Sequence, residues 1–173
     1  MTLAPSVIAQ FDLVWPLAEL HLGALDEGDF LWRPSEVTWS VRLDDHGVWR
    51  PDWADVEPDP MPVPTIAWLT WQVDWWWSTA VDDLLGRTLR RREHVVWPGT
   101  GLAAVSRLQV LAREWRQLMG GLTDEDLRRP TSFPWSADAG RVAIDTVLWV
   151  NVELTKNIAE IGQLRLLRAA IRS

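Results

Sequence analysis

Three polar side chains interrupt a segment that otherwise predicts the most apolar helix of the chain. Glu153, Asn157 and Glu160 recur within residues 149–164 at spacings of four and three residues. At about 100° per residue they share an arc of about 60°, on the side that should face the core. A buried carboxylate or amide is costly unless a partner compensates it. The pattern therefore indicates a binding site, the remains of one, or a hydrogen-bonded internal network.

A second predicted helix, over residues 65–85, also carries a polar residue within its apolar face. Four tryptophans form that face on a helical wheel: Trp68, Trp71, Trp75 and Trp76. Gln72 lies in the middle of the face, whereas Trp77 should lie outside it. Helix bundles commonly build metal and ligand sites from side chains on facing helices. The candidate pocket therefore comprises these side chains: Gln72, Glu153, Lys156, Asn157, Glu160, Trp68 and Trp76.

Periodicity and turn residues predict the elements that position these side chains. Helices are expected over residues 5–24, 65–85, 101–119 and 141–171, which makes the fold all-α. Between the first two helices, alternating residues around the turn Asp44-Asp-His-Gly47 predict a short β-hairpin over residues 38–53. The proline-rich segment 57–64 predicts an extended connector. Pro16 should start, kink or shorten the first helix.

A weak internal repeat relates the two halves of the chain. Residues 25–34 and 122–130 each contain an acidic stretch that ends in Arg-Pro, and each follows one predicted helix and precedes another. An acidic stretch suits the start of a helical turn, and Arg-Pro ends it. The repeat predicts two helix–motif–helix units that pack with approximate twofold symmetry.

The composition limits the classes of partner and chemistry. The 173 residues carry a net charge of −7, which disfavours nucleic acids and anionic lipids as partners. The absence of cysteine excludes disulfides, thiolate metal ligands and a protein thiol nucleophile. No window has the roughly 18 uncharged apolar residues of a membrane span, and the N-terminus lacks the features of a secretory signal. We therefore expect a cytoplasmic protein with a single domain over residues 1–173.

The order and spacing of several motifs resemble the DinB/YfiT superfamily of four-helix bundles, in an actinobacterial-type version. The motifs are Phe11-Asp12 to His21-Leu22, Trp39-Ser40-Val41-Arg42, Thr65-Ile-Ala-Trp68 to Trp71-Gln72, Trp97-Pro98-Gly99, and Asn151 to Arg165. The resemblance implies an up-down-down-up bundle that often forms homodimers. It also implies a divalent metal held by three histidines, one on the second helix and an HxxxH pair on the fourth. Some relatives are thiol-dependent transferases or isomerases.

This chain carries other residues where the resemblance places those histidines. Gln72 falls on the second-helix histidine, and Glu153 and Asn157 fall on the fourth-helix pair. Amide and carboxylate oxygens suit calcium, magnesium or manganese better than zinc or nickel. We therefore expect no resident cofactor, and at most a weakly bound divalent metal at these three residues. Lys156 lies within ion-pairing distance along the helix of Glu153 and Glu160, so an inward-facing ammonium would replace the charge of the metal.

Three functional hypotheses follow. The favoured one is a noncatalytic, metal-free homodimer that binds a small molecule at the candidate pocket. The second is a metal-dependent transferase or hydrolase that uses a low-molecular-weight thiol such as mycothiol, with Glu153 as metal ligand or base. The third is a protein-interaction module in which the tryptophan-rich hairpin, Trp39 to Trp53, binds a partner. The sequence leaves open whether the protein is an enzyme.

Overall fold

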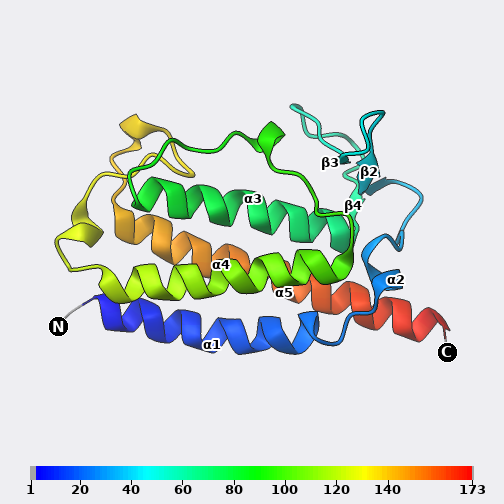
Figure 1. Cartoon of the computed structure of the whole chain (residues 1–173), viewed down its shortest axis with the longest axis horizontal. Coiled ribbons are helices and arrows are strands. Elements are labelled where there is room, and N and C mark those ends of the chain that lie inside the picture. Colours follow the sequence, from blue (N-terminus) through cyan, green and yellow to red (C-terminus); the bar gives the residue numbers. More distant parts are fainter. Residues whose placement is uncertain (1–2, 173) are drawn as a thin grey trace.

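The computed structural model describes residues 3–172, in which four long helices form a bundle (Figure 1). The long helices are α1 (Ala4–Leu22), α3 (Ile66–Leu84), α4 (Gly101–Gly121) and α5 (Ala143–Arg172). The shorter elements are α2 (Glu27–Phe30), η1 (Arg92–His94), η2 (Asp126–Arg128), η3 (Ala137–Ala139), β1 (Thr38–Trp39), β2 (Val41–Leu43), β3 (Trp49–Pro51) and β4 (Val63–Pro64). The all-α prediction is confirmed. None of the helices in the described range is long and apolar enough to cross a membrane.

Helices α1 and α5 run side by side in the same direction. Asn151 Nδ2 donates to Gln10 Oε1 at 2.9 Å, and further along both helices the His21 ring packs against Gly162. A Cβ atom at residue 162 would lie 2.7 Å from His21 Cε1, so glycine allows the two helices to approach closely. Later residues of α1 contact later residues of α5, so the two helices are parallel.

Helix α3 runs opposite to α5 and in the same direction as α4. Gln72 approaches Asn157, whereas Trp76, one turn later in α3, contacts the earlier residue Trp149 of α5. On the other side of α3, Asp74 pairs with Arg107 of α4, and Arg87, which follows α3, pairs with the later residue Glu114 of α4. The helices therefore alternate up-down-down-up, as the sequence predicted.

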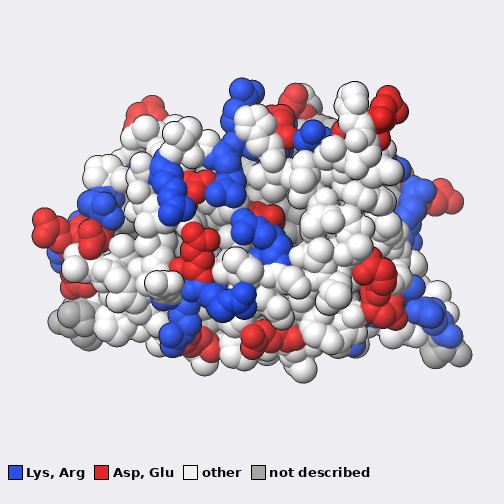
Figure 2. Space-filling view, viewed as in Figure 1, with Lys and Arg blue, Asp and Glu red and all other residues white. Residues whose placement is uncertain are grey.

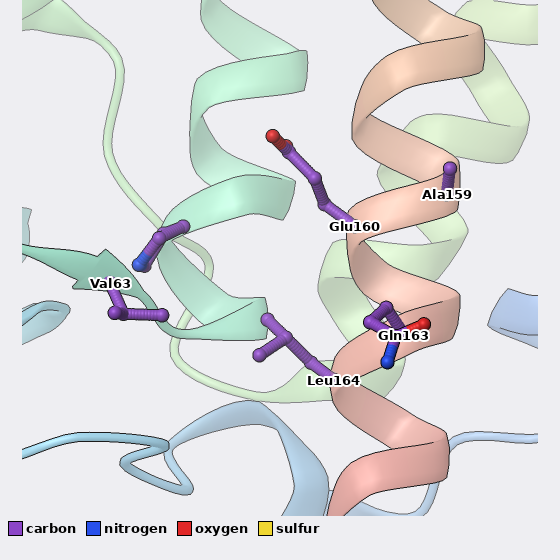
Figure 3. Close-up of a pocket in the computed structure, with 6 residues that line it drawn as sticks. Val63, Ala159, Glu160, Gln163 and Leu164 are labelled. Atoms are coloured by element: carbon purple, nitrogen blue, oxygen red, sulfur yellow. The ribbon is translucent and has the colours of Figure 1, made fainter.

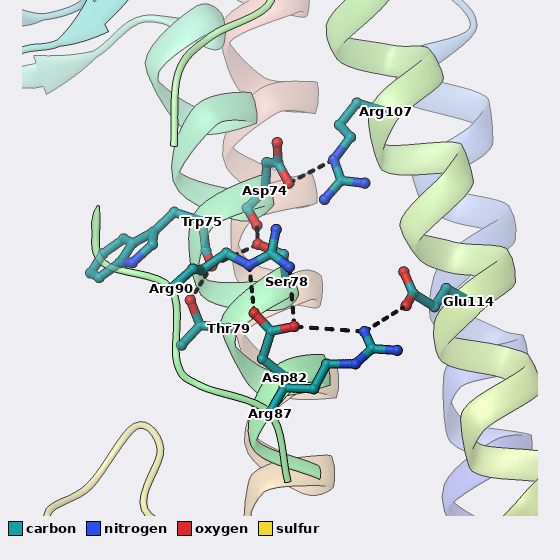
Figure 4. A network of polar contacts seen from close by, with 9 residues as sticks. All are labelled: Asp74, Trp75, Ser78, Thr79, Asp82, Arg87, Arg90, Arg107 and Glu114. Atoms are coloured by element: carbon teal, nitrogen blue, oxygen red, sulfur yellow. Dashed lines mark hydrogen bonds and ion pairs between the residues drawn. The ribbon is translucent and has the colours of Figure 1, made fainter. Parts of the chain in front are cut away.

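Arginines neutralise two inward-facing carboxylates of α3 (Figure 4). Asp82, whose side chain is 5% exposed, accepts from Arg90 Nε at 2.6 Å and from Arg90 Nη2 at 3.1 Å. Asp74 accepts from Arg107 Nε of α4 at 2.9 Å. Burial raises the pKa of Asp74 above its ordinary value, and the charge of Arg107 opposes that shift. Basic and acidic side chains also interleave in the middle of the face that Figure 2 shows. The pairs of Asp82 and Asp74 with arginine fix α4 and the connector after α3 to the bundle.

Side-chain caps explain where α3 and α4 begin. Thr65 has an extended backbone, and its Oγ1 accepts from Trp68 N at 3.3 Å. Thr100 caps α4 in the same way. Both carboxylate oxygens of Glu27 accept from Gly101 N, at 2.8 and 3.0 Å, which places a negative charge at the positive end of α4.

Pro16 neither starts nor ends α1, so those two predictions are wrong. The helix continues through it to Leu22. Proline removes one backbone donor, but Ala18 and Leu22 beyond it are buried in the core and hold the last turns in place.

Both copies of the sequence repeat fold into a short helical turn with a reciprocal cap. At α2, Asp26 N donates to the carboxylate of Asp29, and the Asp26 side chain accepts in return. At η2, Thr123 N donates to Asp126 Oδ2 at 2.9 Å and Asp126 N donates to Thr123 Oγ1 at 3.1 Å. The common turn chemistry in the sequence therefore produces the same local structure in each half.

The predicted hairpin is present, and a second strand pair accompanies it. Strands β2 and β3 are antiparallel, with Val41 opposite Pro51. Strands β1 and β4 are parallel, and the sequence did not predict this pair. Val63 N donates to Val37 O at 3.1 Å and Thr65 N donates to Trp39 O at 2.8 Å. The pairing holds β4 at the entrance to α3 (Figure 1).

The prediction that Trp77 lies outside the buried face of α3 is wrong. Trp77 is 0% exposed, and its ring lies 6.1 Å from that of Phe11 on α1 and 6.3 Å from that of Trp115 on α4. The helical wheel assumed a single buried face. Helix α3 instead packs against helices on one side and against the strands and the 87–97 connector on the other.

Candidate functional site

Asn157 lies at the centre of a hydrogen-bonded cluster between α3 and α5. The residue is 1% exposed, and its Oδ1 accepts from the indole Nε1 of Trp76 at 3.2 Å. Its Nδ2 donates to Glu160 Oε2 at 2.9 Å and approaches Gln72 Oε1 at 3.5 Å, the long limit of a hydrogen bond. We call Gln72, Trp76, Asn157 and Glu160 the Asn157 cluster.

The neighbours of Asn157 determine which way its amide points. The indole N–H of Trp76 can only donate, so the amide oxygen must face it. The NH₂ group then faces two acceptors, the carboxylate of Glu160 on α5 and the amide oxygen of Gln72 on α3. Both polar atoms of Asn157 therefore have partners inside the protein, which compensates the burial of the amide.

Glu153 and Lys156 form an ion pair beside the cluster. Lys156 Nζ lies 2.9 Å from Glu153 Oε2, and the lysine side chain is 51% exposed. Of the two carboxylates that the sequence assigned to Lys156, the structure pairs it with Glu153. Among residues 3–172, no ion pair joins Lys156 to Glu160. The lysine charge therefore lies at the surface rather than between the helices.

The donor atoms at Gln72, Glu153 and Asn157 do not fit a transition metal. Zinc and nickel favour neutral imidazole nitrogens, and these three residues supply none. Asn157 Oδ1 already accepts from Trp76, and Glu153 is held by an ammonium group. In the described part of the chain, no group of three or more His, Cys, Asp or Glu residues could hold a metal ion. We derive no metal-dependent step for this site.

A groove adjoins the Asn157 cluster (Figure 3). It has a volume of about 490 Å³ and lies between β4 and α5. Its lining residues are Val63, Pro64, Ala159, Glu160, Gln163 and Leu164. In the figure Leu164 points from α5 toward β4, whereas the Glu160 side chain points toward α3. We call this feature the β4–α5 groove, and Glu160 belongs both to it and to the cluster.

The structure brings four of the predicted pocket residues together and separates the others from them. The four form the Asn157 cluster, whereas Glu153 and Lys156 flank it on α5. Trp68 faces the strands instead, because its Nε1 donates to Asp52 O at 2.8 Å and its ring stacks on Trp39 at 5.0 Å. Trp76 packs against Trp149 of α5, with the ring centroids 5.4 Å apart.

Sequence reasoning missed most of the groove. Gln163 and Leu164 follow Glu160 by three and four residues, so helical spacing could have added them to the site. Val63 and Pro64 give no comparable signal. They reach the groove only because β4 pairs with β1, a contact between segments that are distant in sequence.

Comparison with known proteins adds one match. A protein-family model described as the DinB superfamily matches residues 10–161. No curated protein sequence and no solved structure matches the chain. The matched range contains the whole Asn157 cluster, whereas Gln163 and Leu164 of the groove lie just beyond its end.

Replacing Asn157 with leucine should lower the free energy of unfolding by about 2 kcal/mol, because the buried indole N–H of Trp76 loses its acceptor. Urea denaturation measures the loss, and the NMR signal of the Trp76 indole proton should shift. Thr155→Leu is the control on the same helix. Thr155 is exposed and its hydroxyl donates to Asn151 O within α5, so its loss should cost less than about 1 kcal/mol. Equal losses in the two variants would contradict the role assigned to Asn157.

Proposed function

The chain belongs to the DinB superfamily, and from this premise we propose that it is a noncatalytic, metal-free bundle that binds a small apolar molecule in the β4–α5 groove. One observation carries the proposal. Asn157 stands at a position where the resemblance expects a metal-binding histidine, and its amide is fully occupied by hydrogen bonds within the protein. The same hydrogen bonds hold Glu160, which lines the adjoining groove.

The size and lining of the groove support a small organic ligand. Ligand pockets generally measure about 300–1,000 Å³ and combine apolar walls with a few polar groups. The β4–α5 groove, at about 490 Å³, lies in that range. Val63, Pro64, Ala159 and Leu164 provide apolar walls, and Glu160 and Gln163 provide the polar side chains.

No observation favours the thiol transferase or the interaction module. A transferase of the expected kind requires Glu153 to bind a metal or accept a proton, whereas Lys156 holds this carboxylate in an ion pair at 2.9 Å. The hairpin module requires tryptophans that are free to meet a partner. Trp39 stacks on Trp68, and Trp49 packs against Trp97, so these rings contribute to the interior.

We also propose that two copies of the chain associate through α1 and α5. Helices α1 and α5 contact each other along a seam that includes Gln10 and Asn151. Both helices present exposed apolar side chains beside this seam: Leu13, Leu17, Leu20, Leu148, Val152 and Leu166. Leu13 and Leu17 follow Gln10, a seam residue, by three and seven positions, so they lie on the same side of α1. The acidic residues of α1 are Asp12 and Glu19, and Asp12 pairs with Arg116 of α4 on the opposite side.

The α1–α5 face is large enough to supply most of a dimer interface. At about 1.5 Å per residue the 19 residues of α1 extend about 28 Å, and two adjacent helices are about 20 Å wide. The resulting footprint, about 560 Å² before the relief of the side chains is counted, approaches the roughly 800 Å² that each partner buries in a stable interface.

Restoring three histidines should restore metal binding. We expect the combined variant Gln72→His, Glu153→His and Asn157→His to bind zinc or nickel stoichiometrically, because imidazole replaces weak or occupied oxygen donors. Wild-type protein, purified without a chelator or an affinity tag, should contain no stoichiometric transition metal. Calorimetric titration and metal analysis measure both results, with Glu153→His alone as the control. Stoichiometric zinc, nickel or iron in the wild type would overturn the metal-free proposal.

The groove should bind the neutral probe hexan-1-ol with a dissociation constant on the order of millimolar. In a ¹⁵N-resolved NMR titration, the amide signals of Gln163 and Leu164 should move. Ala159→Trp should abolish the response by filling the groove, whereas Ala137→Trp, on exposed η3, should leave it intact. Absence of binding, or a response confined to other residues, would refute the groove as a ligand site.

Sedimentation analysis should show a wild-type dimer. Leu13→Glu should raise its dissociation constant by about 100-fold, because the twofold contact buries two unpaired carboxylates. Leu102→Glu is the matched control, since Leu13 and Leu102 are both 75% exposed but Leu102 lies on α4. A monomeric wild type, or equal effects of the two substitutions, would remove the α1–α5 interface.

A further inference from the structure

We propose that the ligand of the β4–α5 groove is a small organic amine whose ammonium group binds Glu160 and whose apolar chain lies against Leu164 and Val63. This inference rests on the proposed function and specifies the chemical class of its ligand. Charge, backbone polarity and the apolar lining support it independently.

Glu160 is the one charged side chain that lines the groove. Its Oε2 accepts from the neutral amide of Asn157, and its Oε1 makes no hydrogen bond to any residue of the described chain. No arginine or lysine within residues 3–172 forms an ion pair with it. The nearest candidate along the helix, Lys156, is bound to Glu153 instead. A partly buried carboxylate without a cation is costly, and a ligand ammonium would supply the missing charge.

Two of the three acids of α3 show one way in which this chain treats such groups. Asp82 is paired with Arg90, and Asp74 with Arg107 (Figure 4). The third, Asp83, accepts hydrogen bonds from the hydroxyls of Thr131 and Ser132. Glu160 is also partly buried and also contributed by a long helix, but it lies beside a groove rather than beside an arginine. The difference places the unsatisfied negative charge where a ligand can reach it.

The backbone of β4 adds an acceptor and no donor to this side. Val63 N and Thr65 N point toward β1, where they donate to Val37 O and Trp39 O. Peptide groups alternate in direction along a strand, so the carbonyl of Pro64 points away from β1. Proline has no N–H, which leaves this edge with acceptors alone. An ammonium group has three donors and matches a carboxylate next to such an edge.

The apolar lining determines the rest of the ligand. Val63, Pro64, Ala159 and Leu164 contribute aliphatic surface, and Leu164 is 8% exposed. An alkyl chain that leaves water for this surface gains affinity with each methylene, by about fourfold. Glu160 and the net charge of −7 disfavour a carboxylate or phosphate head group.

Matched six-carbon probes test the inference. Hexylamine, which is an ammonium at neutral pH, should bind at least about tenfold more tightly than hexan-1-ol, because its bond to Glu160 is charge-assisted. Hexanoate should bind more weakly than the alcohol. The NMR titration of the Gln163 and Leu164 amides measures all three affinities. Butylamine should bind about 16-fold more weakly than hexylamine, since it lacks two methylenes.

Glu160→Gln should remove the advantage of the amine, measured as the ratio of the hexylamine and hexan-1-ol dissociation constants in the same variant. Glutamine retains an oxygen that can accept from Asn157, so the cluster should persist. Glu153→Gln is the control, because that carboxylate pairs with Lys156 and does not line the groove. It should leave the affinities of both probes unchanged.

The outcomes separate this inference from the function on which it rests. Equal affinities of hexylamine and hexan-1-ol in the wild type would overturn the amine while the groove remained a binding site. An amine advantage that survives Glu160→Gln would also overturn it. Failure of every probe to bind would refute the proposed function itself. If butylamine bound as tightly as hexylamine, the contact would be a surface ion pair, and the apolar part of the inference would be wrong.

Discussion

Helix α3 is enclosed by the rest of the protein, and this constraint governs the polar chemistry of the whole structure. No residue from Ile66 to Leu84 is exposed. Most polar groups on the buried sides of the helix therefore need a partner inside the protein, since an unpaired buried group is costly. Asp82 and Asp74 pair with arginines, and Thr70 accepts from the indole of Trp97. Trp76 donates to Asn157, and this hydrogen bond is part of the candidate site.

The same constraint explains why tryptophan is so abundant in this chain. Each indole combines a large apolar surface with one donor, so it can fill the interior and fasten a backbone segment at the same time. Trp68 donates to Asp52 O and Trp71 donates to Val95 O, which holds the strands and the 87–97 connector against α3. Phenylalanine would fill similar space without fixing these segments. Trp77 and Trp115, whose indole N–H groups lack partners among the described residues, serve packing alone.

Local signals in the sequence predicted the helices, because caps and periodicity act within a few residues. Thr65 and the turn around Asp44 did fix the start of α3 and the hairpin. Two features depended on long-range packing and were missed or misjudged, and a third depended on a side-chain conformation. Trp77 is buried because two layers cover α3. Val63 reaches the groove because β4 pairs with β1. Lys156 pairs with Glu153 rather than Glu160 because of its side-chain conformation, which sequence spacing does not determine.

The Asn157 cluster joins α3 and α5 through hydrogen bonds of an amide rather than through a charged group. A cation between α3 and α5 would both bind ligand atoms and balance a carboxylate. In this chain the neutral amide of Asn157 binds the side chains of Trp76, Gln72 and Glu160. Because the amide has no charge, it cannot balance a carboxylate. The charge of Glu160 therefore stays uncompensated by the described residues, at the one point where the cluster opens onto an apolar groove. The proposed amine follows from this arrangement, because a ligand ammonium would balance Glu160 while its apolar chain covers the aliphatic lining of the groove.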